Sequence, residues 1–230
     1  MRKMPPGIRM RVVHCKRHDG MGTLGGEAMK LYTARSGRAN KDTAIKNGVG
    51  LLIVDHWTDP TAYPYFAIDN GCYSAYARGV PWDPAPFMHN LHKARELGLR
   101  PDFAVLPDIV AGGEASMSKS IRWRNVLQAE FPGIPWYIAV QDGITPDMIP
   151  DMGISGIFVG GTKPWKLATM RIWAEYAHRH GIGIHVGRMG SLEDIFGAHD
   201  AGADSIDSTT WVQRNGMLER RIREYREARP

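Results

Sequence analysis

Short apolar segments alternate with longer, mixed segments along most of the chain, and this alternation predicts the fold class. The apolar segments are mostly continuous rather than interrupted by polar residues, which is typical of strands buried on both faces of a parallel sheet. We expect eight such strands, at residues 30–34, 49–55, 66–69, 102–108, 136–141, 156–161, 183–187 and 204–207.

The segments between these strands carry signals for the start and the end of helices. Proline in the first turn and glycine after the last turn are typical of helix boundaries. Ser191 followed by Asp194 also resembles a capping box, and Gly202 then ends that helix. We expect helices that begin near Asp83–Pro84, Thr145–Pro146, Lys163–Pro164 and Ser191, the first ending before Gly98 and the third at Gly181.

Eight strands alternating with helices predict one α/β domain, a single (β/α)8 TIM-type barrel over residues 1–230 without a zinc-binding insert. A doubly wound open sheet is the alternative. The glycine-rich segment 20–26 does not follow an apolar run, however, as a dinucleotide-binding fingerprint would. Within the barrel domain, residues 1–28 form a basic, poorly patterned lead-in and residues 217–230 form a basic helix.

Polar residues or glycines stand at the carboxyl end of most predicted strands. In a (β/α)8 barrel these ends meet at one mouth, where active sites are built. A helix cap or a turn explains any single position equally well, and Asp55, in the turn-like segment DHWTDP, is the weakest member. Several acids at one mouth are costly unless they do chemistry. The set comprises Asp55, Asp69, Asp108, Gln141, Gly160, Gly161, Arg188 and Asp207.

Two kinds of chemistry use several carboxylates in one pocket. Glycosyl transfer needs one carboxylate as the nucleophile at the sugar carbon and a second as acid and base. Metal-dependent hydrolysis uses carboxylates and histidines as ligands, but no HxH or HExxH motif lies at a predicted strand end. Only His185 lies within a strand, and we interpret it as a buried core histidine. We therefore expect neither a metal nor another cofactor in the site.

Charge and cysteine content restrict the setting of this chemistry. The chain has 230 residues, with 29 basic and 24 acidic side chains and a formal net charge of +5. Only two cysteines occur, which excludes a disulfide framework. The sequence contains neither a secretory signal nor an apolar run long enough to span a bilayer, so we expect a cytoplasmic protein.

The C-terminal segment combines a basic stripe with an apolar face that includes Ile222 and Tyr225. The stripe follows from a helical spacing of three between Arg220, Arg223 and Arg226. A solvent-exposed helix whose glutamates compensate the arginines explains this pattern by itself. The lead-in is basic as well, and two basic ends shift the balance modestly toward a polyanionic partner.

The ordered segments FAIDNG, LPD, VQDG, FVGGT, HVGRMGSLEDI and GADSIDSTTW resemble the core of the tRNA-guanine transglycosylase superfamily over roughly residues 66–216. The closer match is the DNA-directed branch, which places 7-deazaguanine bases in bacterial and phage DNA, because the C-terminal zinc site of the tRNA enzymes is absent. The resemblance implies a DNA-guanine transglycosylase. Such an enzyme exchanges guanine for a free 7-deazaguanine base through a covalent aspartyl–glycosyl intermediate. An enzyme that acts on tRNA is the alternative.

The same resemblance gives each matching residue an expected role. Asp207 resembles the nucleophile at sugar C1′, and Asp69 resembles the acid and base beside it. Asp108 resembles the aspartate that binds the N1–H and amino groups of the purine. Gln141 and the backbone of Gly160–Gly161 resemble the groups that bind the base carbonyl. We also expect substrate contacts from Asn70 and Arg188, and nucleic-acid contacts from Arg214, Arg220, Arg223 and Arg226.

The chain departs from the family pattern at several positions, which leaves the base partner open. Asn70 and Cys72 replace family residues, Asp142 interrupts the Gln-Gly-Gly motif, Thr162 follows the glycine pair, and Ser208 stands where a cysteine is expected. Two other classes stay open: a carboxylate-based hydrolase barrel of the phosphodiesterase type, and a non-catalytic barrel that binds nucleic acid. A homodimer stays open as well, and no membrane partner is expected.

Overall fold

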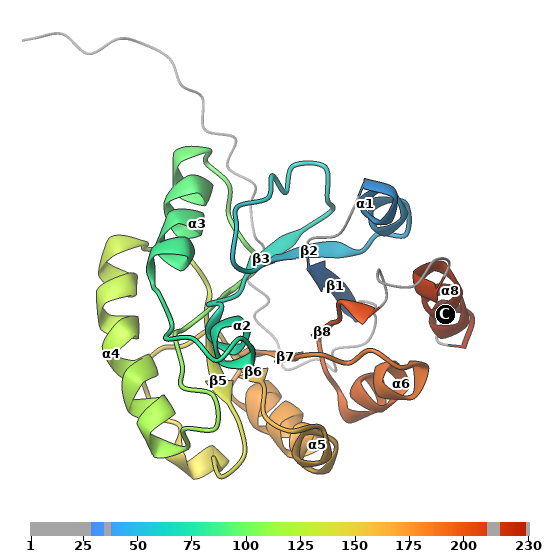
Figure 1. Cartoon of the computed structure of the whole chain (residues 1–230). Helices are drawn as coiled ribbons and strands as arrows, with labels where there is room; N and C mark the ends of the chain where they lie inside the picture. The colour runs from blue at the N-terminus through green and yellow to red at the C-terminus, as the bar shows by residue number, and fades with distance from the viewer. Residues whose placement is uncertain (1–28, 35–37, 211–216, 229–230) are drawn as a thin grey trace, which may run out of the picture.

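The computed structural model describes residues 29–34, 38–210 and 217–228. Eight parallel strands close into a barrel in sequence order, with β1 pairing to both β2 and β8 (Figure 1). The predicted (β/α)8 TIM-type barrel is therefore confirmed, and the open-sheet alternative is wrong. The strands are β1 (Lys30–Ala34), β2 (Gly50–Ile53), β3 (Phe66–Ile68), β4 (Ala104–Val105), β5 (Trp136–Val140), β6 (Gly156–Val159), β7 (Gly183–Val186) and β8 (Ser205–Asp207).

Each strand lies inside the segment predicted for it, and β4 shows why several are shorter. Its ladder continues as far as Leu106, whose N–H donates to the carbonyl of Tyr137 at 2.9 Å. Pro107 has no N–H, so it cannot extend the ladder. The chain therefore leaves the sheet directly before Asp108, which places that carboxylate at the mouth of the barrel.

Helices surround the barrel, and α8 packs outside it against α1 and α6 (Figure 1). Four of the predicted helices, together with the basic C-terminal helix, are present close to their expected bounds. The helices are α1 (Arg38–Lys46), α2 (Cys72–Ala77), α3 (Ala85–Glu96), α4 (Glu114–Glu130), the 3-10 helix η1 (Pro146–Met148), α5 (Lys163–Arg179), α6 (Leu192–Ala201) and α8 (Met217–Ala228).

The capping box expected at the start of α6 is confirmed. The Ser191 hydroxyl accepts from the N–H of Asp194 at 3.1 Å, and the Asp194 carboxylate accepts from the N–H of Ser191 at 3.0 Å. Three helices, α1, α2 and α4, are not among the predictions. In α4 the buried residues include Ser116 and Ser120, so no continuous apolar stripe marks this helix in the sequence.

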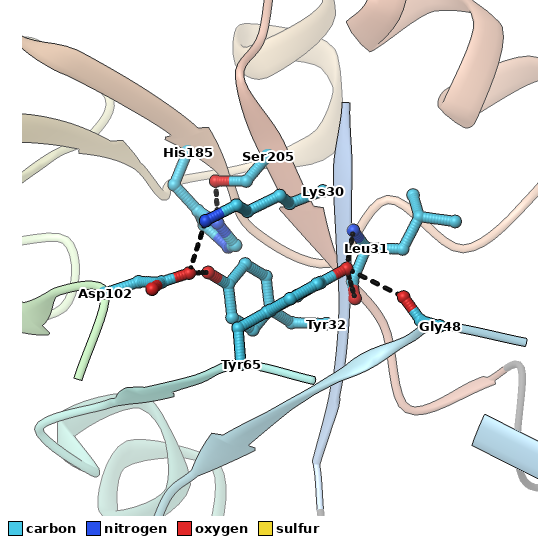
Figure 2. A network of polar contacts seen from close by, with 8 residues as sticks. All are labelled: Lys30, Leu31, Tyr32, Gly48, Tyr65, Asp102, His185 and Ser205. Atoms are coloured by element: carbon cyan, nitrogen blue, oxygen red, sulfur yellow. Dashed lines mark hydrogen bonds and ion pairs between the residues drawn. The ribbon is translucent and has the colours of Figure 1, made fainter. Parts of the chain in front are cut away.

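Aromatic side chains fill the barrel interior, which makes it a packed core rather than a channel. Phe103 stacks on Tyr137 with ring centroids 4.4 Å apart, and Tyr32 meets Phe103 edge-on at 5.6 Å. At the amino-terminal end of the strands, Lys30 and the Tyr32 hydroxyl donate to the same oxygen of Asp102, at 2.7 and 2.6 Å (Figure 2). This network joins β1 to the segment before β4 at the end of the barrel opposite the mouth.

Two of the predicted features fall outside the part of the chain that the structure describes. The lead-in at residues 1–28 and Arg214 lie outside the described residues. Across the ranges that are described, no helix has both the length and the apolar character that crossing a bilayer requires.

Candidate active site

A cavity of about 960 Å³ opens at the carboxyl ends of the strands. Side chains and backbone from β2 through β8 and the loops that follow them line this cavity, as expected for a (β/α)8 barrel. All of the catalytic and substrate-binding residues expected from the sequence are among them: Asp69, Asn70, Asp108, Gln141, Gly160, Gly161, Arg188 and Asp207. The expected convergence of the strand ends is therefore confirmed, while the individual contacts of these residues differ from the expectation in several cases.

Asp207, the last residue of β8, is nearly buried and is held by two donors on one oxygen. Its Oδ1 accepts from His185 Nε2 at 3.0 Å and from the backbone N–H of Arg188 at 3.1 Å. The Arg188 backbone is left-handed, with φ at 59°. Such a conformation is uncommon outside glycine and persists where surrounding contacts enforce it. Here it turns the Arg188 N–H toward the carboxylate.

The Arg188 side chain supplies contacts that hold this strained turn. Its Nη2 donates to the carbonyl of Gly161 at 2.8 Å, and its guanidinium lies 4.0 Å from the centre of the Tyr73 ring. A cation over an aromatic face is attractive. Arg188 therefore ties the loop after β7 to the loop after β6 and to α2, and it borders the cavity with Tyr73.

Asp69 follows β3 and has an environment that suits proton transfer. Its Oδ1 accepts from the N–H of Gly71 at 2.7 Å, and Gly71 has φ at 74°, so the Asn-Gly turn holds the carboxylate in place. Burial, with a smaller contribution from the nearby carboxylates of Asp207, Asp108 and Asp55, raises the pKa of Asp69 to about 7 against the lowering effect of the Gly71 hydrogen bond. A group with a pKa near neutral can both give and take a proton.

Asp108 and Asn70 form a pair at the mouth. Asn70 Nδ2 donates to Asp108 Oδ1 at 3.0 Å and to the carbonyl of Leu106 at 2.8 Å, while Asn70 Oδ1 accepts from the N–H of Cys72 at 2.8 Å. Burial raises the pKa of Asp108, against the opposing effect of the Asn70 hydrogen bond. These three contacts orient Asp108 and the turn, and a contact of Asn70 with substrate stays a prediction.

Gln141 is held by three hydrogen bonds. Its Oε1 accepts from the N–H of Ala111 at 2.6 Å, and its Nε2 donates to the carbonyl of Ile109 at 2.6 Å and to Ser116 Oγ at 2.9 Å. The two amide hydrogens are thus engaged by the loop between β4 and α4 and by Ser116 of α4. Gln141 therefore positions the loop that carries Asp108, and its contact with the base carbonyl stays a prediction.

The glycine pair after β6 allows a close approach of two loops. Gly161 has φ at 76°, and a Cβ there would lie 2.4 Å from an oxygen of Asp142. Asp142 accepts from the N–H and the hydroxyl of Thr162 at 2.7 and 2.6 Å. The Gly160 N–H donates to the carbonyl of Val140 at 2.8 Å. The N–H of Gly160 is therefore used by the sheet. Of the two backbone N–H groups expected to bind the base carbonyl, that of Gly161 remains the candidate.

Two residues of the site were not expected from the sequence. Lys166 lines the cavity although it is only 2% exposed, and its Nζ donates to the carbonyl of Gly187. Burial, with a smaller contribution from the charge of Arg188, lowers the pKa of Lys166 to about 8 against the opposing effect of Asp207. Lys166 lies in α5, and the prediction from the sequence considered only residues at the ends of strands. His185 is buried as expected, but its contact with Asp207 makes it part of the site.

The basic helix α8 only partly fits the expected nucleic-acid surface. Ile222 and Tyr225 are buried, which confirms the apolar face. Arg226 donates to the carbonyl of Asn47, which precedes β2 and therefore lies at the end of the barrel opposite the mouth. Arg220 lies 3.7 Å from Glu224. Arg226 therefore joins α8 to the segment that follows α1, and nucleic-acid contacts of the three stripe arginines stay a prediction.

Fold and site together define the class of this protein: a (β/α)8 barrel with a pocket at the carboxyl ends of its strands, whose lining includes the carboxylates of Asp69, Asp108 and Asp207 and the cationic side chains of Lys166 and Arg188. Among the residues that the structure describes, no group of three or more His, Cys, Asp or Glu side chains is arranged to hold a metal ion. Comparison of the chain with protein-family models and with curated protein sequences gives no match.

Proposed function

We propose that this barrel is a base-exchanging pentosyltransferase of the transglycosylase type, which replaces guanine in DNA with a free 7-deazaguanine base. One observation carries the proposal. Three aspartates from three strands line one pocket, and each has a different environment. Asp207 has two N–H donors on one oxygen, Asp69 has a pKa of about 7, and Asp108 is held by Asn70. Carboxylates separated in this way can take separate catalytic roles.

The reaction divides into two displacements at the sugar C1′. In the first, an oxygen of Asp207 forms a bond to C1′ while the bond from C1′ to guanine N9 breaks. The electron pair of that bond stays on the leaving guanine, which takes a proton from Asp69. In the second, the incoming base gives its proton to the Asp69 carboxylate and attacks C1′, and Asp207 leaves as a carboxylate. Two displacements retain the configuration at C1′.

The walls of the pocket complement the two edges of guanine. The N1–H and amino groups are donors and suit the carboxylate of Asp108, since charge-assisted hydrogen bonds are the strong ones. The carbonyl O6 is an acceptor and suits the wall that carries Lys166 and Arg188. The Tyr73 ring borders the same cavity and offers an aromatic face to a base that has left the stack. DNA rather than tRNA is proposed because of the resemblance to the DNA-directed branch, with tRNA as an arm of the test.

A denaturing gel tests the proposal directly. The parent protein is incubated with guanine-containing DNA or with tRNA, and covalent protein–nucleic acid species are counted. We expect an adduct with DNA from the parent and none from Asp207→Ala. Asp69→Asn should form it about 10² to 10⁴ times more slowly. Asp147→Ala is the matched control, because Asp147 is an exposed aspartate of η1.

The possible outcomes separate the alternatives. An adduct with tRNA alone would move the substrate to RNA. An adduct that persists in Asp207→Ala but is lost in Asp69→Asn would exchange the two roles. If the parent forms no adduct with either nucleic acid and incorporates no labelled guanine, glycosyl transfer is wrong. Analysis of metal content and of phosphodiesterase activity would then test the hydrolase class.

A further inference from the structure

His185 joins the site to the barrel core. It lies on β7 opposite Ser205 of β8, and its side chain is fully buried. Its Nε2 lies 3.0 Å from Asp207 Oδ1, and its Nδ1 lies 2.9 Å from Ser205 Oγ. Figure 2 shows the ring beside Ser205, deep in the barrel. Both ring nitrogens therefore have a partner, one at the mouth and one farther inside.

Aromatic rings fix the plane of the imidazole. Phe158 stacks against it with centroids 4.8 Å apart and planes at 21°, and Phe103 and Tyr32 contact it at 5.0 and 5.7 Å. Tyr32 is itself held by its hydroxyl, which donates to Asp102 at 2.6 Å (Figure 2). Packed interiors leave a ring in this position little freedom to rotate. The direction of the Nε2–H bond is therefore set by the core.

The two contacts also bear on where the imidazole proton lies. In the proposed attack Asp207 acts as a carboxylate, which can only accept a hydrogen bond, so this role requires a proton on His185 Nε2. Nδ1 then accepts from the Ser205 hydroxyl or, in the doubly protonated ring, donates to it. The Arg188 N–H approaches the same oxygen of Asp207 at 3.1 Å. Among the residues that the structure describes, both hydrogen-bond donors to this carboxylate thus approach Oδ1, so we assign the attack on substrate to Oδ2.

We propose that His185 is a positioning residue, which together with the Arg188 N–H holds Asp207 Oδ1 so that Oδ2 attacks C1′. This proposal rests on the function proposed above. In the covalent intermediate, Oδ2 is bonded to C1′ and Oδ1 is the carbonyl oxygen of the ester. When the bond from Oδ2 to C1′ breaks, its electron pair returns to the carboxylate, whose charge the two donors stabilise. His185 should therefore assist both formation and breakdown of the adduct.

Two substitutions separate the donor from the ring. His185→Phe keeps an aromatic ring between its aromatic neighbours but has no N–H, whereas His185→Gln loses the ring and keeps a donor at a similar reach. We expect His185→Phe to slow single-turnover adduct formation roughly ten- to a hundredfold. In His185→Gln, the loss of rate should be at most about half of that in His185→Phe on a logarithmic scale. The dissociation constant for DNA should stay within about twofold of the parent value in both variants. A parent-like rate in His185→Phe, or equal losses in the two variants, would overturn the proposal.

An NMR measurement makes a failure of this proposal distinguishable from a failure of the proposed function. Long-range ¹H–¹⁵N spectra of histidine-labelled parent protein should show one imidazole ring with its proton on Nε2. The signal of this ring is assigned to His185 by its absence from the spectrum of His185→Gln. The same signal should shift in Asp207→Asn. A proton on Nδ1 alone would overturn the contact itself, whatever the activity. If the contact is present but the parent forms no adduct and exchanges no base, the proposed function is wrong, and the role of His185 in attack is wrong with it.

Discussion

The Asp69 carboxylate should destabilise the protein above neutral pH, and Asp69→Asn should remove this cost. Burial and three neighbouring acids raise the pKa of Asp69 from 3.8 to about 7. A group whose pKa is higher in the folded state than in the unfolded state stabilises the fold below its unfolded pKa. That contribution is lost as the pH rises through the folded pKa. The loss therefore extends from about pH 4 to pH 7, and at pH 8 the parent carries the full cost.

The size of the effect follows from the two pKa values. A gap from 3.8 to about 7 corresponds to at most about 4 kcal/mol, at about 1.4 kcal/mol for each tenfold change in acidity. Asp69 borders a cavity that admits water, which weakens the cost of charging it. We therefore expect the free energy of unfolding of Asp69→Asn, relative to that of the parent, to increase by about 2 kcal/mol as the pH is raised from 5 to 8. The asparagine Oδ1 can still accept from Gly71, so the turn is retained.

Urea unfolding of the parent and of Asp69→Asn at pH 5 and pH 8 measures this gain. Asp142→Asn is the matched control, a carboxylate at the same mouth. Burial tends to raise the pKa of Asp142, but its hydrogen bonds from Thr162 outweigh burial and lower it. Its contribution is present above the unfolded pKa, so Asp142→Asn should be less stable at both pH values. If the free energies of unfolding of Asp69→Asn and the parent differ by the same amount at pH 5 and pH 8, Asp69 does not have a raised pKa in the folded protein.

Three further predictions concern activity and binding. The rate of adduct formation should fall about tenfold for each pH increase of one above about pH 7, as Asp69 loses its proton; a pH–rate profile without this limb would argue against Asp69 as the acid. Asp108→Asn should reduce labelled-guanine exchange roughly a hundredfold, because an acceptor oxygen becomes a donor facing a donor; unchanged exchange would remove Asp108 from the base pocket. Neutralising Arg220 and Arg223 should make the salt dependence of DNA binding shallower by about 0.9 in log–log slope for each lost phosphate contact. Arg226→Gln should instead lower the stability of the protein without changing this slope. Equal slopes in the parent and all variants would show that α8 is a solvent-exposed helix that makes no phosphate contact.

The eight strands could be predicted because each is a short continuous apolar run, and because a closed parallel barrel buries both faces of every strand. The helices α1, α2 and α4 could not be predicted with the same rules. In α4, Ser116 and Ser120 face inward and bond to Gln141 and to Pro107, so the buried face is partly polar. Periodicity of apolar residues does not detect a helix that packs through hydrogen bonds.

The candidate site shows a related limit. The strand-end rule could identify which residues meet at the mouth, because topology alone decides that. It could not identify which of them keep free polar groups, because this depends on backbone groups of neighbouring loops. Gln141 is used by the loop before α4, and Asn70 by Asp108 and the turn. Lys166 reaches the cavity from a helix, where no sequence rule for strand ends applies.

The distribution of hydrogen-bond donors distinguishes the acids to which different roles are proposed. Neighbouring carboxylates disfavour one another's charge, and hydrogen-bond donors oppose this effect. Asp207 receives two N–H groups on one oxygen, one from the rigid imidazole of His185 and one from the strained turn at Arg188. Asp69 receives one, from Gly71, and it is the acid whose pKa rises to about 7. These environments agree with the proposed roles, in which Asp207 forms and releases the covalent bond and Asp69 exchanges a proton. The same barrel backbone supplies both environments, because β7 and β8 place donors beside Asp207 while the turn after β3 leaves Asp69 with one.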